Sequence, residues 1–351
     1  MPESTLPRRP FEHDRVIGLW LGLCCLTIFA MVVLGGVTRL TGSGLSMVEW
    51  EPILGVLPPL SEAEWEDTFA KYRQYPEYRL KNAGMDLTGF KEIFWLEYFH
   101  RLLGRGIGLL FALPFLYFLI RRRIDPALTP RLIGLFVLGG LQGLMGWYMV
   151  QSGMVDDPHV SQYRLTAHLL LAIVIYVWML WLVMDLLRGR HRVRVSGGWV
   201  RGGYALTGLV LLTIASGGFV AGLKAGFTFN TFPLMNGQWL PDGLMLMEPV
   251  WKNLFENIIT VQFNHRVLAM ALAAIVVVFW WLARRRTDSP AVRRALDLML
   301  AAMSLQIALG ISTLLLVVPV PLAAAHQAGA VLLLTAVLNV AHEFRRPDAF
   351  G

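Results

Sequence analysis

The chain has 351 residues, of which 56% are hydrophobic and 16% are charged, and its formal net charge is +7. A soluble domain carries about 25% charged residues, so this composition excludes a cytosolic enzyme, a disordered chain and a disulfide-rich secreted domain. It predicts a membrane protein, in which an excess of Lys and Arg indicates cytoplasmic loops and does not require nucleic acid as a partner.

Eight segments are long and apolar enough to cross a bilayer, which takes about 20 residues. They cover residues 16–38, 96–120, 132–151, 163–187, 203–222, 258–282, 294–318 and 321–343. Arg39 and a glycine-rich turn follow the first segment, so we expect an uncleaved span and not a signal peptide. No Arg- and Ser-rich presequence precedes it, which favours a bacterial inner membrane over a mitochondrial one. The predicted fold class is an all-α, polytopic membrane protein.

Arginines gather in alternate connections between these segments. They occur in the N-terminal tail, in 121–131, in 188–201, in 284–294 and in the C-terminal tail, whereas 152–162 and 319–321 have no Lys or Arg. By the positive-inside rule both termini are cytoplasmic. An even number of spans requires the same arrangement.

Two of the outer connections, 39–95 and 223–257, are long. Segment 61–73 starts with a serine and an acidic first turn, which predicts a short amphipathic helix. Segment 223–257 holds several Phe and Trp residues among Gly and Pro. Such a loop either anchors the protein at the membrane surface or covers a substrate, and the residues leave both open. Adjacent Cys24 and Cys25 lie in one span, where they cannot form an ordinary disulfide, and we interpret them as structural filler.

The two halves of the chain repeat the same features. Glu97, His100, Arg101, Gln142, Gly146 and His168 correspond to Gln262, His265, Arg266, Gln306, Gly310 and His326, and Gly35-Gly36 corresponds to Gly217-Gly218. Such a pattern predicts two tandem four-helix units with a pseudo-symmetry axis near the membrane normal. The expected organisation is a cytoplasmic tail 1–15, a unit 16–187 with periplasmic loop 39–95, a cytoplasmic linker 188–202, a unit 203–343 with periplasmic loop 223–257, and a tail 344–351.

Four of the histidines, two in each unit, fall at the outer ends of the even-numbered spans. They are His100, His168, His265 and His326. A lone histidine in a span usually makes a helix–helix hydrogen bond, but a repeated pair of neutral imidazoles on facing helices suits the axial positions of a haem iron. Zinc would require further ligands. We therefore expect two haem sites near the periplasmic face.

The two expected sites differ at one position. Glu97 stands three residues before His100, whereas Gln262 stands three residues before His265. A carboxylate within a span is costly and usually functional, so Glu97 is a candidate for proton transfer or for stabilising a positively charged intermediate, with an ion pair to Arg101 or Arg105 as the alternative. Arg101 and Arg266 are candidate partners of haem propionates, or they extend to lipid headgroups.

The remaining histidines have no counterpart in the other half, and we interpret them as ordinary polar residues. They are His13, His159, His191 and His342. The adjacent acids Asp156 and Asp157 beside His159 are weak grounds for a cation site.

Several motifs together resemble the haem A synthase family. They are GGVTRLTGSGLSMVEW, EYFHRLLGR, RLTAHLL, QFNHRVLAM and LAAAHQAGA, and the resemblance extends from about residue 16 to residue 343. It implies an oxidoreductase that oxidises the C8 methyl group of haem O to the formyl group of haem A, through successive hydroxylations and loss of water from a geminal diol. Since the outer loops lack cysteine, the chain looks like the branch of alphaproteobacteria and mitochondria.

The resemblance also implies roles for the site residues. Glu97 matches the essential glutamate of the family, so His100 and His168 are expected to bind the iron of haem O, and His265 and His326 the iron of a haem b cofactor. The implied partners are haem O synthase, an electron donor such as a ferredoxin-type protein, cytochrome oxidase as recipient of haem A, and membrane lipid.

Three other functions are alternatives to haem A synthesis. A dihaem cytochrome b that exchanges electrons with quinone would have the same four histidines but would not need Glu97. The prenyltransferase that makes haem O needs aspartate-rich motifs, and no DxxxD occurs in the loops. A transporter or assembly factor would use the histidines as structural contacts and would bind no haem.

Overall fold

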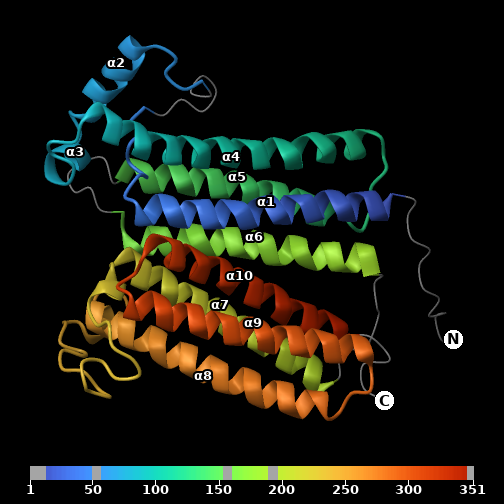
Figure 1. Cartoon of the computed structure of the whole chain (residues 1–351). Helices are drawn as coiled ribbons and strands as arrows, with labels where there is room; N and C mark the ends of the chain where they lie inside the picture. The colour runs from blue at the N-terminus through green and yellow to red at the C-terminus, as the bar shows by residue number, and fades with distance from the viewer. Residues whose placement is uncertain (1–12, 50–56, 153–159, 189–196, 346–351) are drawn as a thin grey trace.

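A computed structural model describes residues 13–49, 57–152, 160–188 and 197–345 of the chain, and within these ranges the protein is helical (Figure 1). The long helices are α1 (Asp14–Leu40), α4 (Leu87–Ile120), α5 (Thr129–Ser152), α6 (Gln162–Arg188), α7 (Gly198–Gly222), α8 (Ile258–Arg284), α9 (Pro290–Leu315) and α10 (Val320–Glu343). All eight are long and apolar enough to cross a membrane, which confirms the eight predicted spans. Short helices α2 (Glu62–Tyr72), α3 (Pro76–Leu80), η1 (Ala225–Phe227) and η2 (Val250–Leu254) lie in the connections.

Helices α4, α7 and α9 depart most from the predicted limits, and α7 begins at Gly198 instead of residue 203. Helix α4 begins at Leu87 instead of residue 96, because the Asp86 side chain accepts a hydrogen bond from the backbone N–H of Gly89 and caps the helix there. The helix therefore continues beyond its apolar segment. Helix α9 ends at Leu315 instead of residue 318, because Val317 and Val318 adopt left-handed backbone angles before Pro319.

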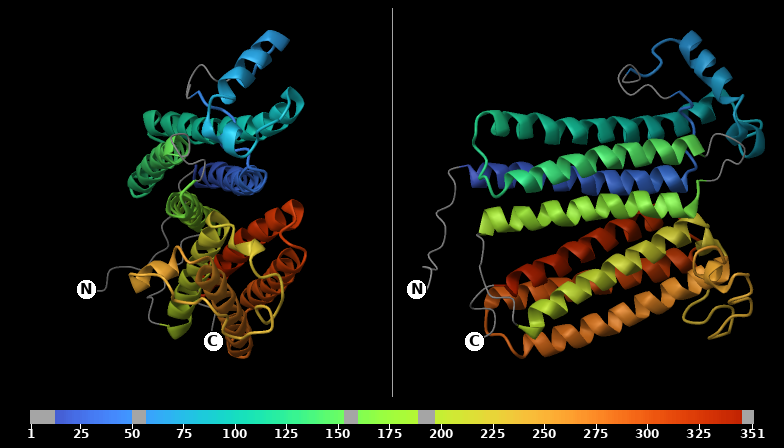
Figure 2. Two further views of the ribbon diagram at one scale, coloured as in Figure 1. Left: turned by 90° about the vertical axis from the view of Figure 1, so that its left-hand side faces the viewer. Right: turned by 180° about the vertical axis from the view of Figure 1, so that it is seen from behind.

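The helices pack into two groups that meet along α6. In the first group α1 contacts α4 and α6, and α5 contacts α6; in the second, α7 contacts α8 and α10, and α9 contacts the same two helices. Helix α6 contacts α7 and α10, and α1 contacts α10, which joins the groups (Figure 2). Helix α1 starts and α10 ends at the same end of the bundle, while α2 and α3 lie at the opposite end, which we call the lobe end (Figure 1).

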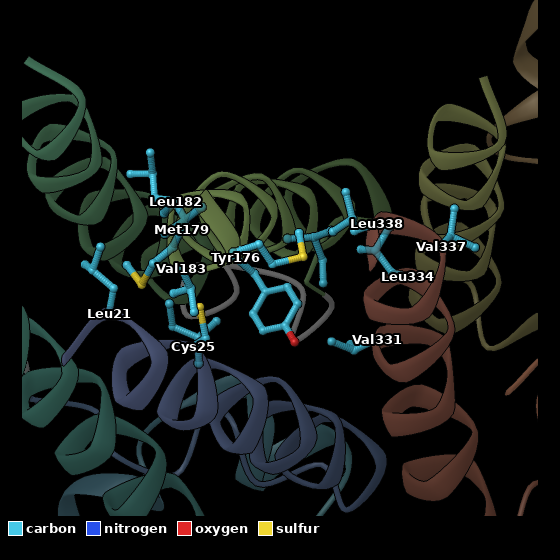
Figure 3. Packing of buried hydrophobic residues seen from close by; sticks show 14 of the residues in the cluster. Leu21, Cys25, Tyr176, Met179, Leu182, Val183, Val331, Leu334, Val337 and Leu338 are labelled. Atoms are coloured by element: carbon cyan, nitrogen blue, oxygen red, sulfur yellow. The ribbon is translucent and has the colours of Figure 1, made fainter. Parts of the chain in front are cut away.

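The apolar core is continuous through the junction between the groups. Leu21 and Cys25 of α1, Tyr176 and Met179 of α6, and Leu334 of α10 are all buried in one cluster (Figure 3). The Tyr176 and Thr335 hydroxyls also hydrogen-bond across it, at 2.8 Å. The cysteines are free thiols, in keeping with their interpretation as filler.

Near the lobe end, α6 and α7 approach each other closely at two glycines of α7. A methyl group on Gly222 would lie 2.7 Å from the Cα atom of Gln162, and one on Gly218 would lie 2.8 Å from the Thr166 hydroxyl. Glycines four residues apart allow such backbone contact between membrane helices. Arg39 also links α1 to α7, because its guanidinium donates to the carbonyls of Ala221 and Gly222 at the end of α7.

Replacing Gly222 with alanine is expected to destabilise the protein by about 1–3 kcal/mol, the usual cost of overpacking. The new methyl group would meet the Gln162 backbone, which cannot rotate away, so α6 and α7 must separate. Gly208→Ala is the matched control, since a methyl group at this site on the same helix meets no atom within 4 Å. Thermal unfolding in detergent checks this, and equal Tm values for the two variants would contradict it.

The opposite end of the α6–α10 contact holds a buried polar cluster. The His342 ring and the Arg345 guanidinium both lie against Asp185 Oδ1, at 3.2 and 3.4 Å. Asp185 and His342 are 7% and 2% exposed. His342, interpreted as an ordinary polar residue, thus has a structural place: it joins the last helices of the two groups. No repeat partner marks it, because the cluster occurs only where the groups meet.

At the lobe end, α2 packs on the extension of α4, and α3 packs on α2. Trp65 and Tyr72 of α2 are buried against Phe90 and Phe94 of α4. The predicted helix 61–73 is confirmed, and Ser61 caps it by accepting from the backbone N–H of Glu64. This aromatic packing explains why α4 extends past the apolar segment: its first turns are stabilised by the lobe and do not need lipid.

Candidate functional site: two histidine pairs

The four site histidines lie in the lobe-end parts of four different helices. His100 is on α4, His168 on α6, His265 on α8 and His326 on α10. His100 and His168 belong to the first group of helices, and His265 and His326 belong to the second. Each group thus holds two of the predicted residues near its lobe end.

Each histidine ring packs against a glycine on the preceding long helix. A methyl group on the glycine would lie 3.6 Å from the ring for Gly35 and His100, 3.2 Å for Gly146 and His168, 3.3 Å for Gly217 and His265, and 2.8 Å for Gly310 and His326. The sequence marked these glycines only as repeated positions. Their recurrence on the helix before each histidine was the signal that could have revealed the contact.

The residues around the two histidine pairs suit a cofactor that itself supplies most of the ligands of its metal ion. Among the residues that the structure describes, no three His, Cys, Asp or Glu side chains form a group that could hold a metal ion. Two imidazoles can instead fill both axial positions of a haem iron, whose other ligands come from the porphyrin.

Glu97 is 2% exposed and is held by hydrogen-bond donors only. Its Oε2 atom accepts from the Ser46 hydroxyl and the Met47 backbone N–H, both at 2.7 Å, and its Oε1 atom accepts from Arg101 at 2.5 Å. The ion pair with Arg101 that was one alternative is therefore present. It leaves the chemical role of Glu97 open, since a carboxylate can both anchor a loop and exchange a proton.

In each half the arginine next to the first histidine ties down a loop. Arg101 donates to the carbonyls of Met47 and Glu49, and Arg266 donates to those of Phe229 and Thr231. Both arginines thus point toward the lobe end, where their loops lie. The Nε atom of Arg266 is buried and makes no hydrogen bond within the described part of the chain.

The position equivalent to Glu97 carries different chemistry. Gln262 donates from Nε2 to the Phe229 carbonyl at 3.0 Å, and its Oε1 atom is buried with no hydrogen-bond partner among the described residues. An amide cannot take up a proton at neutral pH. The two sites are therefore alike in histidines and arginines but unlike in acid–base capacity.

Gln142 was noticed only as a repeated residue, and the structure places it against a site histidine. Its Nε2 atom donates to the His168 carbonyl at 3.1 Å and lies 3.2 Å from the Nδ1 atom of the same ring. His159, His191, Asp156 and Asp157 lie outside the described residues.

Comparisons with known proteins agree over nearly the whole chain. Residues 18–338 match the family model COX15-CtaA, described as cytochrome oxidase assembly protein. The Heme A synthase of Nitrosospira multiformis is 55% identical, covering 98% of both chains, and that of Nitrosomonas eutropha is 50% identical, covering 96% of both. Heme A synthase COX15 of Arabidopsis thaliana is 45% identical over 96% of this chain and 76% of its own length. The chain belongs to the COX15-CtaA family of cytochrome oxidase assembly proteins.

Proposed function

We propose that the chain makes haem A from haem O at the pair His100 and His168, and holds a haem b cofactor at the pair His265 and His326. Haem A synthase activity follows from the full-length identity to curated enzymes of that name. The oxidation to the aldehyde level ends with the loss of water from a geminal diol, in which a proton moves from one hydroxyl group to the other. The observation that carries the assignment of the two sites is the presence of Glu97 in one half and Gln262 in the other.

A haem b cofactor fits the residues of the C-terminal half. His265 and His326 offer two imidazoles, and the Nε of Arg266, which has no hydrogen-bond partner among the described residues, offers a buried N–H donor for a propionate. When bound, haem b supplies one-electron transfer, and this role needs no carboxylate. Gln262, Arg266 and the loop carbonyls they hold would close the lobe end of this site.

At the substrate half, Glu97 would act as the acid–base group. Its Oε2 atom would take the proton from one hydroxyl of the geminal diol and return it to the other hydroxyl as that group leaves as water, while Arg101 holds Oε1 and so keeps the carboxylate oriented. The hydrogen bonds from Ser46 and Met47 fix the loop 42–49 over the same carboxylate. Arg101 is then also the candidate propionate partner of haem O.

The proposed location is the bacterial inner membrane, with both termini cytoplasmic and the histidine pairs on the periplasmic side. The arginines at 121–123 and 284–286 support this, because the connections that hold them lie at the end of the bundle where α1 starts and α10 ends (Figure 1). Haem O synthase, an electron donor such as a ferredoxin-type protein, and cytochrome oxidase are the proposed partners.

The test is chromatography of the haems extracted from purified protein after coexpression with a haem O synthase. We expect haem A, or its hydroxylated precursor, together with haem b. Haem b alone, at two per chain, would overturn the assignment of unlike sites and would identify an electron-transfer cytochrome.

A further inference from the structure

The ring of His265 has a hydrogen-bond partner on the helix beside it. Its Nδ1 atom lies 2.8 Å from the hydroxyl oxygen of Ser216, and the same oxygen lies 2.8 Å from the carbonyl oxygen of Thr213. A serine hydroxyl has one proton, and a carbonyl can only accept. Ser216 therefore donates to Thr213 and accepts from the N–H at Nδ1 of His265.

This bond fixes which ring nitrogen carries the proton. With Nδ1 protonated, the Nε2 atom of His265 keeps its lone pair, which is the form that ligates a metal. An acceptor on the other nitrogen also orients the ring and makes it a stronger ligand.

The N-terminal half has no equivalent group. The repeated glycine pairs align Ser216 with Leu34, whose side chain can neither donate nor accept a hydrogen bond. Within the described part of the chain, the ring of His100 makes no hydrogen bond, although Gly35 packs against it as Gly217 packs against His265. His100 and His265 thus have the same glycine contact, but within the described residues only the ring of His265 is hydrogen-bonded.

We propose that Ser216 is a positioning residue that fixes His265 as a strong, permanent axial ligand, and that Leu34 leaves His100 as a weaker, exchangeable one. This inference rests on the proposed function, in which the C-terminal pair holds a resident haem b and the N-terminal pair holds a substrate. A resident cofactor requires a ligand that stays bound, whereas a substrate must enter and leave. Ser216 acts through His265 and does not itself touch the iron.

The experiment compares Ser216→Ala with Ser304→Ala in the full-length protein. Ser304 is the matched control, because it also bonds a carbonyl of its own helix, that of Leu300, but has no histidine beside it. Each serine substitution is made in protein that also carries His100→Ala and His168→Ala. The haem measured is then the one at the C-terminal pair. Haem loss to excess apomyoglobin and the midpoint potential are recorded.

We expect Ser216→Ala to lose haem about 10–100 times faster, the usual effect of removing such a partner, and to shift the midpoint potential upward because a weaker imidazole donor stabilises ferric iron less. Ser216→Thr keeps the hydroxyl and should restore both values, while Ser304→Ala should change neither. Unchanged loss rate and potential in Ser216→Ala would overturn the inference, as would a threonine variant that behaves like alanine.

The proposed function is checked separately by His265→Ala. If that variant retains haem b, the assignment of the C-terminal pair fails. If it loses haem b but Ser216→Ala matches the parent, only the role of Ser216 fails.

Discussion

Protein with Glu97→Gln is expected to retain its bound haems but to form haem A about 10²–10⁴ times more slowly, the range for loss of a general acid–base group. Glutamine has the size of glutamate but cannot take up a proton. It also places an amide N–H₂ among donors, because Ser46, Met47 and Arg101 all donate to Glu97. Chromatography of extracted haems should show hydroxylated haem O accumulating in place of haem A.

Two control variants separate the chemistry of Glu97 from its hold on the loop. Glu92→Gln makes the same change at an exposed acid of α4 and should leave haem A formation unchanged. Arg101→Ala removes the ion pair but keeps the carboxylate, so we expect a smaller loss than with Glu97→Gln. Equal losses in Glu97→Gln and Arg101→Ala, with haem O still bound in both, would show that Glu97 acts only by positioning the loop. Parental haem A formation in Glu97→Gln would contradict any direct role.

The spans could be predicted because each one is a long apolar segment, and a bilayer leaves few alternatives to a helix for such a segment. The first turns of α4 could not be predicted in this way. They are helical because Phe90 and Phe94 pack against Trp65, a contact between residues far apart in the sequence, and because Asp86 caps the helix. Local composition predicted the amphipathic helix α2 but not that it packs on α4.

The histidines could be identified because they recur in both halves with the same neighbours. The contacts around these histidines could not be identified from the sequence, because they join different helices. Gly146 and His168 are far apart in the sequence yet in contact, and Ser216 gave no signal since its counterpart is Leu34. His342 and Asp185 were missed for a similar reason: their cluster joins the two groups of helices, and a search for repeats finds only features that both groups share.

Replacing His265 or His326 with alanine is expected to remove haem b almost completely, since one imidazole is lost from a site that offers two. The apoprotein should also be less stable, because a ligand that binds only the folded state contributes about 4 kcal/mol when present at a thousand times its Kd. Haem b content by pyridine haemochrome absorbance and the Tm in detergent measure the two effects.

The matched variants are His100→Ala and His168→Ala, which make the same change at the equivalent helices of the other half. These variants should keep one haem b per chain and should unfold at nearly the parental Tm. They should no longer form haem A. The opposite pattern, with haem b lost from the His100 and His168 variants and kept in the others, would exchange the two sites. That outcome would place Glu97 beside the cofactor and Gln262 beside the substrate, so a different group would then have to move the proton when the geminal diol loses water.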